Sequence, residues 1–106
     1  MNIQFKKGAL ELCVLALLCE KDYYGYELVQ AISSNVDIAE GTVYPLLRRL
    51  QKEGYFETYI RESEEGPARK YYHITGTGRE YTATLKTEWK TFVRGVETLI
   101  GEEEAI

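Results

Sequence analysis

Apolar residues recur at helical spacing between Gly41 and Gly54. Four of them, at positions i, i+3, i+4 and i+7, share one face of a predicted helix: Val43, Leu46, Leu47 and Leu50. Gly54 follows the periodic residues, where glycine commonly ends a helix. Hydrogen-bond donors and one aromatic ring fall outside this stripe and suit the major groove of DNA: Thr42, Tyr44, Arg48, Arg49 and Lys52. The alternative is an ordinary amphipathic helix with a solvated basic face.

Two segments after this helix favour the first interpretation. Residues 55–61 and 68–75 are rich in aromatic and β-branched residues, roughly alternate, and flank a polar turn that contains Gly66. They predict a β-hairpin. Arg69 and Lys70 lie just past its tip, where they are expected to meet a phosphate backbone.

The remaining elements are predicted from the same periodicities. Residues 7–20 are apolar nearly all round, so this helix is expected to be buried on several sides. Residues 22–25 form a predicted turn before a second helix near residues 26–33. The last helix begins after Thr75, its expected N-cap residue.

This order predicts an α+β, mainly α fold: a winged helix-turn-helix, in which the hairpin is the wing, with an added C-terminal dimerisation helix. We divide the chain into two expected domains. Residues 1–75 form the winged-helix DNA-binding domain. Residues 76–106 form the C-terminal dimerisation helix and an acidic tail.

The last helix carries an apolar stripe that is too long for the core of one small domain. Its members repeat at spacings of four, four, three, four and three residues, close to a coiled-coil seam: Tyr81, Leu85, Trp89, Phe92, Val96 and Leu99. We therefore expect a homodimer formed by this helix and the helix at residues 7–20. In the alternative, the stripe folds back onto its own domain.

The net charge of −4 does not exclude a nucleic-acid partner. Four of the acidic residues lie in the last ten positions: Glu97, Glu102, Glu103 and Glu104. The rest of the chain has 13 acidic and 13 basic residues. Binding to DNA depends on the local face rather than on the net balance. The acidic wing tip nevertheless favours a second hypothesis, a winged-helix protein-interaction module without specific DNA binding. A salt titration of binding to promoter DNA distinguishes the two hypotheses.

Other classes of function lack the residues that they need. Cys13 and Cys19, six residues apart on one predicted helix, are too distant for a disulfide, and no metal-ligand spacing is present. The chain has one histidine, His73, no catalytic triad and no phosphate-binding loop, so we expect no enzyme activity, metal or cofactor. The longest apolar run, residues 12–19, is too short to span a membrane and lacks signal-peptide flanks, which predicts a cytoplasmic protein.

With these residues in view, the chain resembles the small PadR-family transcriptional regulators, which have a single C-terminal helix. The resemblance covers roughly residues 7–92. It depends on four segments that occur in the family's order and spacing: KGALEL at 7–12, YGYEL at 24–28, GTVYPLLRRLQKEG at 41–54, and RKYYHIT at 69–75 with Gly78. The chain departs from the family at Ala39, where a serine or threonine cap is common, and at Ala68, where a basic residue is common.

The resemblance implies a homodimeric winged helix that represses transcription. Dimer symmetry then predicts a pseudo-palindromic operator in double-stranded DNA. Tyr26, at the start of the second helix, is carried over from the family as a phosphate contact.

The resemblance also implies a small aromatic effector. Some small PadR-like multidrug regulators have a tryptophan at the position of Trp89 and hold planar drugs between the two symmetry-related indoles. The cavity would be lined by Leu12, Ala16, Phe92 and Val93. The alternative is that Trp89 only fills the dimer core.

Overall fold

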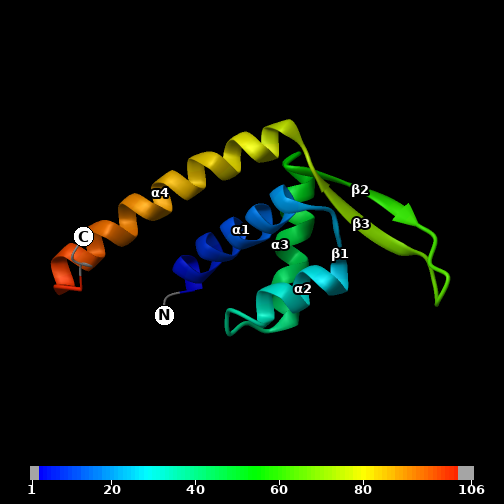
Figure 1. Ribbon diagram of the computed structural model, residues 1–106, viewed down its shortest axis with the longest axis horizontal. Coiled ribbons are helices and arrows are strands. Elements are labelled where there is room, and N and C mark those ends of the chain that lie inside the picture. Colours follow the sequence, from blue (N-terminus) through cyan, green and yellow to red (C-terminus); the bar gives the residue numbers. More distant parts are fainter. Residues whose placement is uncertain (1–2, 103–106) are drawn as a thin grey trace.

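The computed structural model describes residues 3–102, which fold into four helices and a three-stranded sheet (Figure 1). The elements follow in the order α1 (Ile3–Glu20), β1 (Tyr23–Tyr24), α2 (Gly25–Ser33), α3 (Glu40–Lys52), β2 (Phe56–Arg61), β3 (Arg69–Ile74) and α4 (Gly76–Ile100). This confirms the predicted winged helix-turn-helix with a long C-terminal helix.

The hydrophobic core lies where α1, α2 and α3 meet the inner face of the sheet. α1 contacts α2, β3 and α4, which confirms that it is buried on several sides. The four apolar residues that predicted the inner face of α3 are all buried. α2 adds three buried residues: Leu28, Val29 and Ile32. The sheet adds four: Tyr23, Phe56, Tyr72 and Ile74.

The wing hairpin belongs to a sheet with the strand order β1-β3-β2. β1 replaces part of the turn predicted at residues 22–25, because Tyr23 and Tyr24 pair antiparallel with Tyr72 and Tyr71 of β3. The prediction of a simple turn is therefore wrong at these two residues. A two-residue strand is too short to show alternation, and its partner lies far along the chain.

α3 ends at the glycine that the sequence predicts. Gly54 has a φ of 84°, in the left-handed region that glycine adopts without strain. Its N–H donates to the carbonyl of Gln51 at 3.0 Å, and the N–H of Tyr55 donates to that of Leu50 at 3.1 Å. This pair of hydrogen bonds is a Schellman motif, and it turns the chain from α3 into β2.

The first turn of α4 is bonded to the end of α3. The hydroxyl of Thr75 accepts a hydrogen bond from the N–H of Gly78 at 3.0 Å and donates one to the carbonyl of Gly54 at 2.8 Å. This confirms Thr75 as the N-cap residue. Gly78 packs so tightly here that a Cβ atom would lie 2.0 Å from the carbonyl oxygen of Tyr55.

The wing and the far end of α4 extend from opposite ends of the molecule (Figure 1). α4 runs antiparallel to α1, and its C-terminal end extends past the start of α1 in this view. The long helix is therefore positioned at one end by the winged-helix core and reaches away from it at the other.

Candidate nucleic-acid interface

The side of α3 opposite the core is polar and exposed. Side chains with hydrogen-bonding groups occupy it along the length of the helix: Thr42, Tyr44, Arg48 and Lys52. Arginine can bond guanine edges in the major groove, while lysine, threonine and tyrosine can hold phosphates. The face predicted from the sequence is thus presented to solvent by the fold.

Tyr44 and Arg48 lie beside the inner face of the sheet, at Tyr72. Burial raises the pKa of Tyr72; neighbouring Tyr44 raises it further, and the positive charge of Arg48 lowers it. A Cβ atom on Gly25 would lie 3.6 Å from Cε1 of Tyr44 and 3.7 Å from Cε2 of Tyr72. Both rings therefore lie beside Gly25 at the start of α2, and Arg48 follows Tyr44 by one turn of α3.

Arg49 has different surroundings from Arg48. Its Nη1 lies 3.1 Å from Oε1 of Glu53, and its Nη2 lies 3.4 Å from Oε2 of Glu11. Desolvation acts to lower the pKa of Arg49, but hydrogen bonds and charges of both carboxylates outweigh it and raise the pKa. Within residues 3–102, no comparable ion pair forms at Arg48. The structure thus separates two arginines that the sequence left equivalent.

Arg69 and Lys70 point to opposite faces of the wing, because successive residues of a strand alternate. Lys70 lies on the inner face, with its Nζ 5.7 Å from the ring centroid of Tyr72. Arg69 lies on the outer face, with its guanidinium carbon 4.5 Å from the ring centroid of Tyr24. Only Lys70 is therefore on the side of the wing that continues from α3.

Tyr26 is in the first turn of α2 and is 60% exposed. Thr42 occupies a similar place in the first turns of α3, and its N–H bonds the carbonyl of Ala39 at 3.0 Å. Helix N-termini are favourable places for phosphate groups. Both side chains are therefore accessible where a phosphate contact is expected.

The outer face of the sheet carries a row of tyrosines that the sequence pattern did not reveal. Tyr24, Tyr71 and Tyr59 lie side by side across the three strands. Their ring centroids are 5.7 and 5.5 Å apart, and the guanidinium of Arg61 lies 5.1 Å from the ring of Tyr71. Period-two spacing places Tyr59 and Arg61 on one face, but the row depends on β1, which has no sequence signal of its own.

Asp22 fastens this outer face to the end of α1. Its carboxylate accepts a hydrogen bond from the Tyr59 hydroxyl at 2.7 Å and lies 2.8 Å from Nδ1 of His73. Partial burial acts to raise the pKa of Asp22, but these hydrogen bonds and nearby positive charge outweigh it and lower the pKa. The wing is thereby held at a defined angle to the helical core.

The arrangement of helices and wing is shared with known proteins. Residues 14–84 match the model of the transcriptional regulator PadR-like family, which is more than half of the chain. The chain belongs to the PadR family. It is therefore a DNA-binding transcriptional regulator and not an enzyme.

Relatives of this PadR-family chain cover most of its length. It is similar to a PadR-like transcriptional regulator from Bacillus cereus, with 39% identity and a TM-score of 0.84 over 94% of this chain and 99% of that one. It is 40% identical over 87 residues to a protein from Lysinibacillus sphaericus, covering 78% of this chain and 80% of that protein. A transcriptional regulator from Mycobacterium tuberculosis is 31% identical over 77 residues, 72% of this chain and 71% of the relative.

The described residues of this PadR-family chain offer neither a metal site nor a membrane-spanning helix. Among residues 8–102, whose side chains the structure describes, no group of three or more His, Cys, Asp or Glu residues could hold a metal ion. Within residues 3–102, no helix combines the length and the apolar character needed to cross a bilayer. Cys13 and Cys19 are free thiols.

The apolar stripe on α4 of this PadR-family chain divides into two parts. Leu85 packs half-buried against the core of its own chain. Tyr81 also packs within the chain, since its ring stacks on Tyr55 at 4.3 Å and its hydroxyl donates to Oε1 of Glu11 at 2.8 Å. The sequence placed both in the dimer seam. The rest of the stripe is exposed: Trp89, Phe92, Val96 and Leu99.

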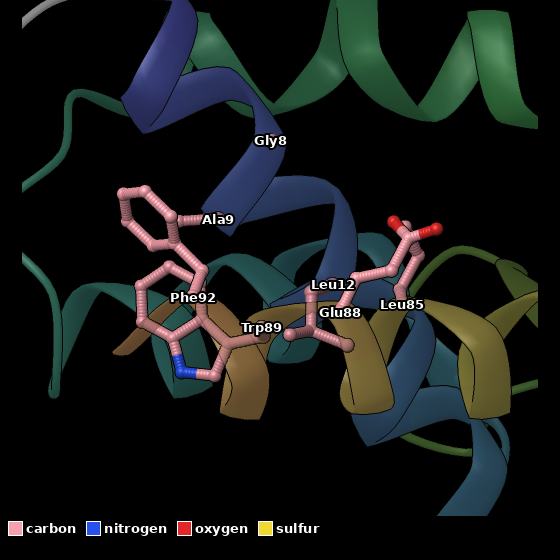
Figure 2. A pocket seen from close by; sticks show the side chains of 7 residues that line it. All are labelled: Gly8, Ala9, Leu12, Leu85, Glu88, Trp89 and Phe92. Carbon is pink, nitrogen blue, oxygen red and sulfur yellow. The ribbon is translucent and has the colours of Figure 1, made fainter. Parts of the chain in front are cut away.

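A hollow lies between α1 and α4 where the exposed part begins (Figure 2). It has a volume of about 270 Å³, and Trp89 and Phe92 project from α4 toward Ala9 on α1. Three residues of the predicted ligand site line the hollow: Leu12, Trp89 and Phe92. Four residues that were not predicted for this site complete the lining: Gly8, Ala9, Leu85 and Glu88. Val93 lines a neighbouring hollow with Trp89, and Ala16 lines neither.

Proposed function

We propose that this PadR-family chain is a homodimeric repressor that binds a pseudo-palindromic operator through α3 and the inner face of the wing. The observation that carries the proposal is that Tyr44 and Tyr72 both lie beside Gly25, that Lys70 lies 5.7 Å from the ring of Tyr72, and that the exposed Arg48 follows Tyr44 by one turn of α3. These side chains come from two elements but share one side of the molecule. A helix in the major groove with a wing against the adjacent backbone needs this arrangement.

Each side chain of this surface has a proposed role. Arg48 reads base edges, with Thr42 beside it in the groove. Tyr44, Lys52 and Lys70 hold phosphates along the edges of the groove, and Tyr26 reaches a phosphate from the start of α2. Arg69, on the outer face, contributes only to the general attraction of the wing for the backbone.

A second copy of the chain is the proposed partner of the exposed part of the α4 stripe. Leu99 is 87% exposed and Phe92 51% exposed in the protomer. Burying one such side chain fully contributes about 1.5–3 kcal/mol, so several together favour association. A twofold axis through this region would pair each stripe with its copy and with α1.

The twofold axis also determines the proposed operator. Two α3 helices related by the axis read two half-sites in opposite directions, about one or two turns of DNA apart. Occupation of such a site within a promoter blocks access by RNA polymerase, which is the proposed basis of repression.

We also propose that a planar aromatic effector releases the operator by binding between the two subunits at Trp89. The hollow in one protomer, about 270 Å³, lies just below the usual range of ligand pockets. Two such hollows joined across the dimer axis would form a site of ordinary size. Its apolar lining and paired indoles suit flat molecules without demanding particular polar groups.

Titration of a promoter duplex over a series of salt concentrations tests the DNA-binding proposal. The logarithm of the binding constant should fall linearly as the logarithm of the salt concentration rises. A duplex of scrambled sequence should bind more weakly than the promoter duplex. Arg48→Ala should cost about 1–3 kcal/mol and relax sequence choice. Lys86→Ala, which removes an exposed charge from α4, is the matched control. Equal and weak binding of both duplexes would instead favour a protein-interaction module.

Fluorescence of Trp89, the only tryptophan of the chain, tests the effector proposal. Proflavine and 4-hydroxybenzoic acid are suitable planar probes, one cationic and one phenolic. Saturable quenching that Ala9→Leu weakens would support a site in the hollow, because the larger side chain fills it. Absence of quenching by either probe would leave Trp89 with a packing role in the dimer.

A further inference from the structure

Glu11 of α1 lies between the recognition helix α3 and the long helix α4. Its Oε1 accepts a hydrogen bond from the Tyr81 hydroxyl of α4 at 2.8 Å. Its Oε2 lies 3.4 Å from Nη2 of Arg49 on α3. The side chain of Glu11 is only 12% exposed. Each oxygen of one carboxylate thus serves a different helix; we call Glu11, Tyr81 and Arg49 the Glu11 bridge.

Both outer members of the Glu11 bridge are held from a second side. The ring of Tyr81 stacks on Tyr55 with an interplanar angle of 11°, and Tyr55 is part of the motif that ends α3. The guanidinium of Arg49 also bonds Oε1 of Glu53 at 3.1 Å, in the residue that follows α3. The end of α3 is therefore contacted twice, through Arg49 and through Tyr55.

The protonation of Tyr81 supports this arrangement. Burial, followed by the hydrogen bond to Glu11, raises the pKa of Tyr81 to about 12. The hydroxyl therefore remains a donor across the physiological range. Exposed ion pairs contribute little to stability. The carboxylate of Glu11, however, is largely buried, and it forms an ion pair with Arg49 as well as accepting the hydrogen bond from Tyr81.

We propose that the Glu11 bridge sets the orientation of α3 relative to α4, so that Glu11, Tyr81 and Arg49 are positioning residues for DNA recognition. Arg49 then acts through the protein rather than by reading bases. The inference depends on the proposed function, since it assumes that α3 contacts the operator. Any change in the packing of α4 on α1 would reach α3 through these three side chains.

The slope of operator affinity against salt concentration separates positioning from contact. A side chain that holds a phosphate contributes about 0.9 to this slope, whereas one that only orients α3 contributes nothing. Tyr81→Phe removes one hydroxyl and no charge. We expect it to weaken operator binding about three- to tenfold with an unchanged slope. Tyr55→Phe is the matched control, since among residues 8–102, whose side chains the structure describes, its hydroxyl makes no hydrogen bond, whereas that of Tyr81 bonds Glu11.

Arg49→Gln is expected to weaken operator binding with an unchanged slope, and its effect should not add to that of Tyr81→Phe. Arg48→Gln should instead add independently and relax sequence choice, as a base contact does, whereas Lys52→Gln should lower the slope, as a phosphate contact does. Circular dichroism and thermal unfolding of each variant show whether the fold is retained. Glu11→Gln, which keeps the size of the side chain, provides the third measurement and should weaken binding similarly.

The failure of this inference differs from the failure of the proposed function. Normal operator affinity in Tyr81→Phe, or additive effects and a reduced slope in Arg49→Gln, would overturn the positioning role alone. Lack of specific binding by the unaltered protein, or no effect of Arg48→Gln, would overturn the proposed use of α3 itself.

Discussion

The two halves of α4 carry the same apolar spacing in different environments. In the first half, Thr82 is buried and Leu85 packs against the core of its own protomer. In the second half, Val96 and Leu99 are exposed. The same spacing of apolar residues therefore accompanies packing within the chain in the first half and exposure in the second.

The length of α1 explains the difference between these halves. α4 has 25 residues and α1 has 18, and the two helices run antiparallel. α1 can cover only the first part of its longer neighbour. The hollow at Trp89 lies where the intramolecular covering ends, so it marks the boundary between the two environments.

Gly78→Ala should have the largest effect, because it disrupts the packing of the first half of α4. The added Cβ would lie 2.0 Å from the Tyr55 carbonyl oxygen and 2.9 Å from Cδ1 of Ile74, and the backbone atom cannot move aside easily. We expect a loss of about 3 kcal/mol or more in the free energy of unfolding, measured with urea. Gly76→Ala is the control, because a Cβ there meets no atom within 4 Å. Equal stability of the two variants would contradict the packing of this turn.

Val96→Glu, in the second half of α4, should weaken dimerisation without unfolding the protomer. An unpaired charge in an apolar interface costs several kcal/mol, so the dimer dissociation constant should rise at least about a hundredfold. Sedimentation equilibrium measures this change, and Thr91→Glu provides the same charge elsewhere on the exposed surface of α4. A variant that remains as dimeric as the control would place the interface elsewhere.

Leu85→Ala should sharpen the boundary between the two halves. Because Leu85 is half-buried within its own protomer, we expect the free energy of unfolding to fall by about 1–2 kcal/mol. The dimer dissociation constant should change much less than it does in Val96→Glu. Urea unfolding at a protein concentration well below the dimer dissociation constant measures the stability of the protomer alone. If Leu85→Ala changed the dimer dissociation constant more than the stability of the protomer, the boundary between the two halves would lie closer to Thr75.

The smallest expected effect concerns the pH dependence of the first half. The folded pKa of Tyr81, about 12, exceeds the unfolded value near 10. The stabilisation is therefore fully present below about pH 10 and is lost as the pH rises toward 12. Tyr81→Phe should lower the free energy of unfolding by about 1 kcal/mol at pH 8. The difference from the unaltered protein should shrink at pH 11; a constant difference would exclude the hydroxyl as its source.

Local pattern was sufficient for the helices and the wing, because amphipathic spacing, Gly54 and Thr75 act within a few residues of chain. It was insufficient for β1, whose pairing with β3 depends on distant residues. The same limit applies to the candidate site. Arg48 and Arg49 are neighbours on one helix, and the ion pairs of Arg49 with Glu53 and with Glu11 of α1 distinguish them; the approach of Glu11 depends on the fold.

The wing and the seam show the same limit. Arg69 and Lys70 were predicted as a pair, although strand alternation alone already sends them to opposite faces. Tyr81 continues the spacing of the seam, but its hydroxyl finds a carboxylate inside the protomer. A polar group on an otherwise apolar stripe is the signal that could have separated it from Leu99.

The bonded junction between α3 and α4 makes α4 a lever arm. Its 25 residues span about 37 Å, at 1.5 Å per residue. In a dimer that meets at the far end, a tilt of about 5° would displace the Thr75 end by about 3 Å, close to the rise of one base pair. Since Thr75 is bonded to Gly54, α3 follows this displacement. The crossing angle of two α4 rods would then select how many base pairs separate the half-sites.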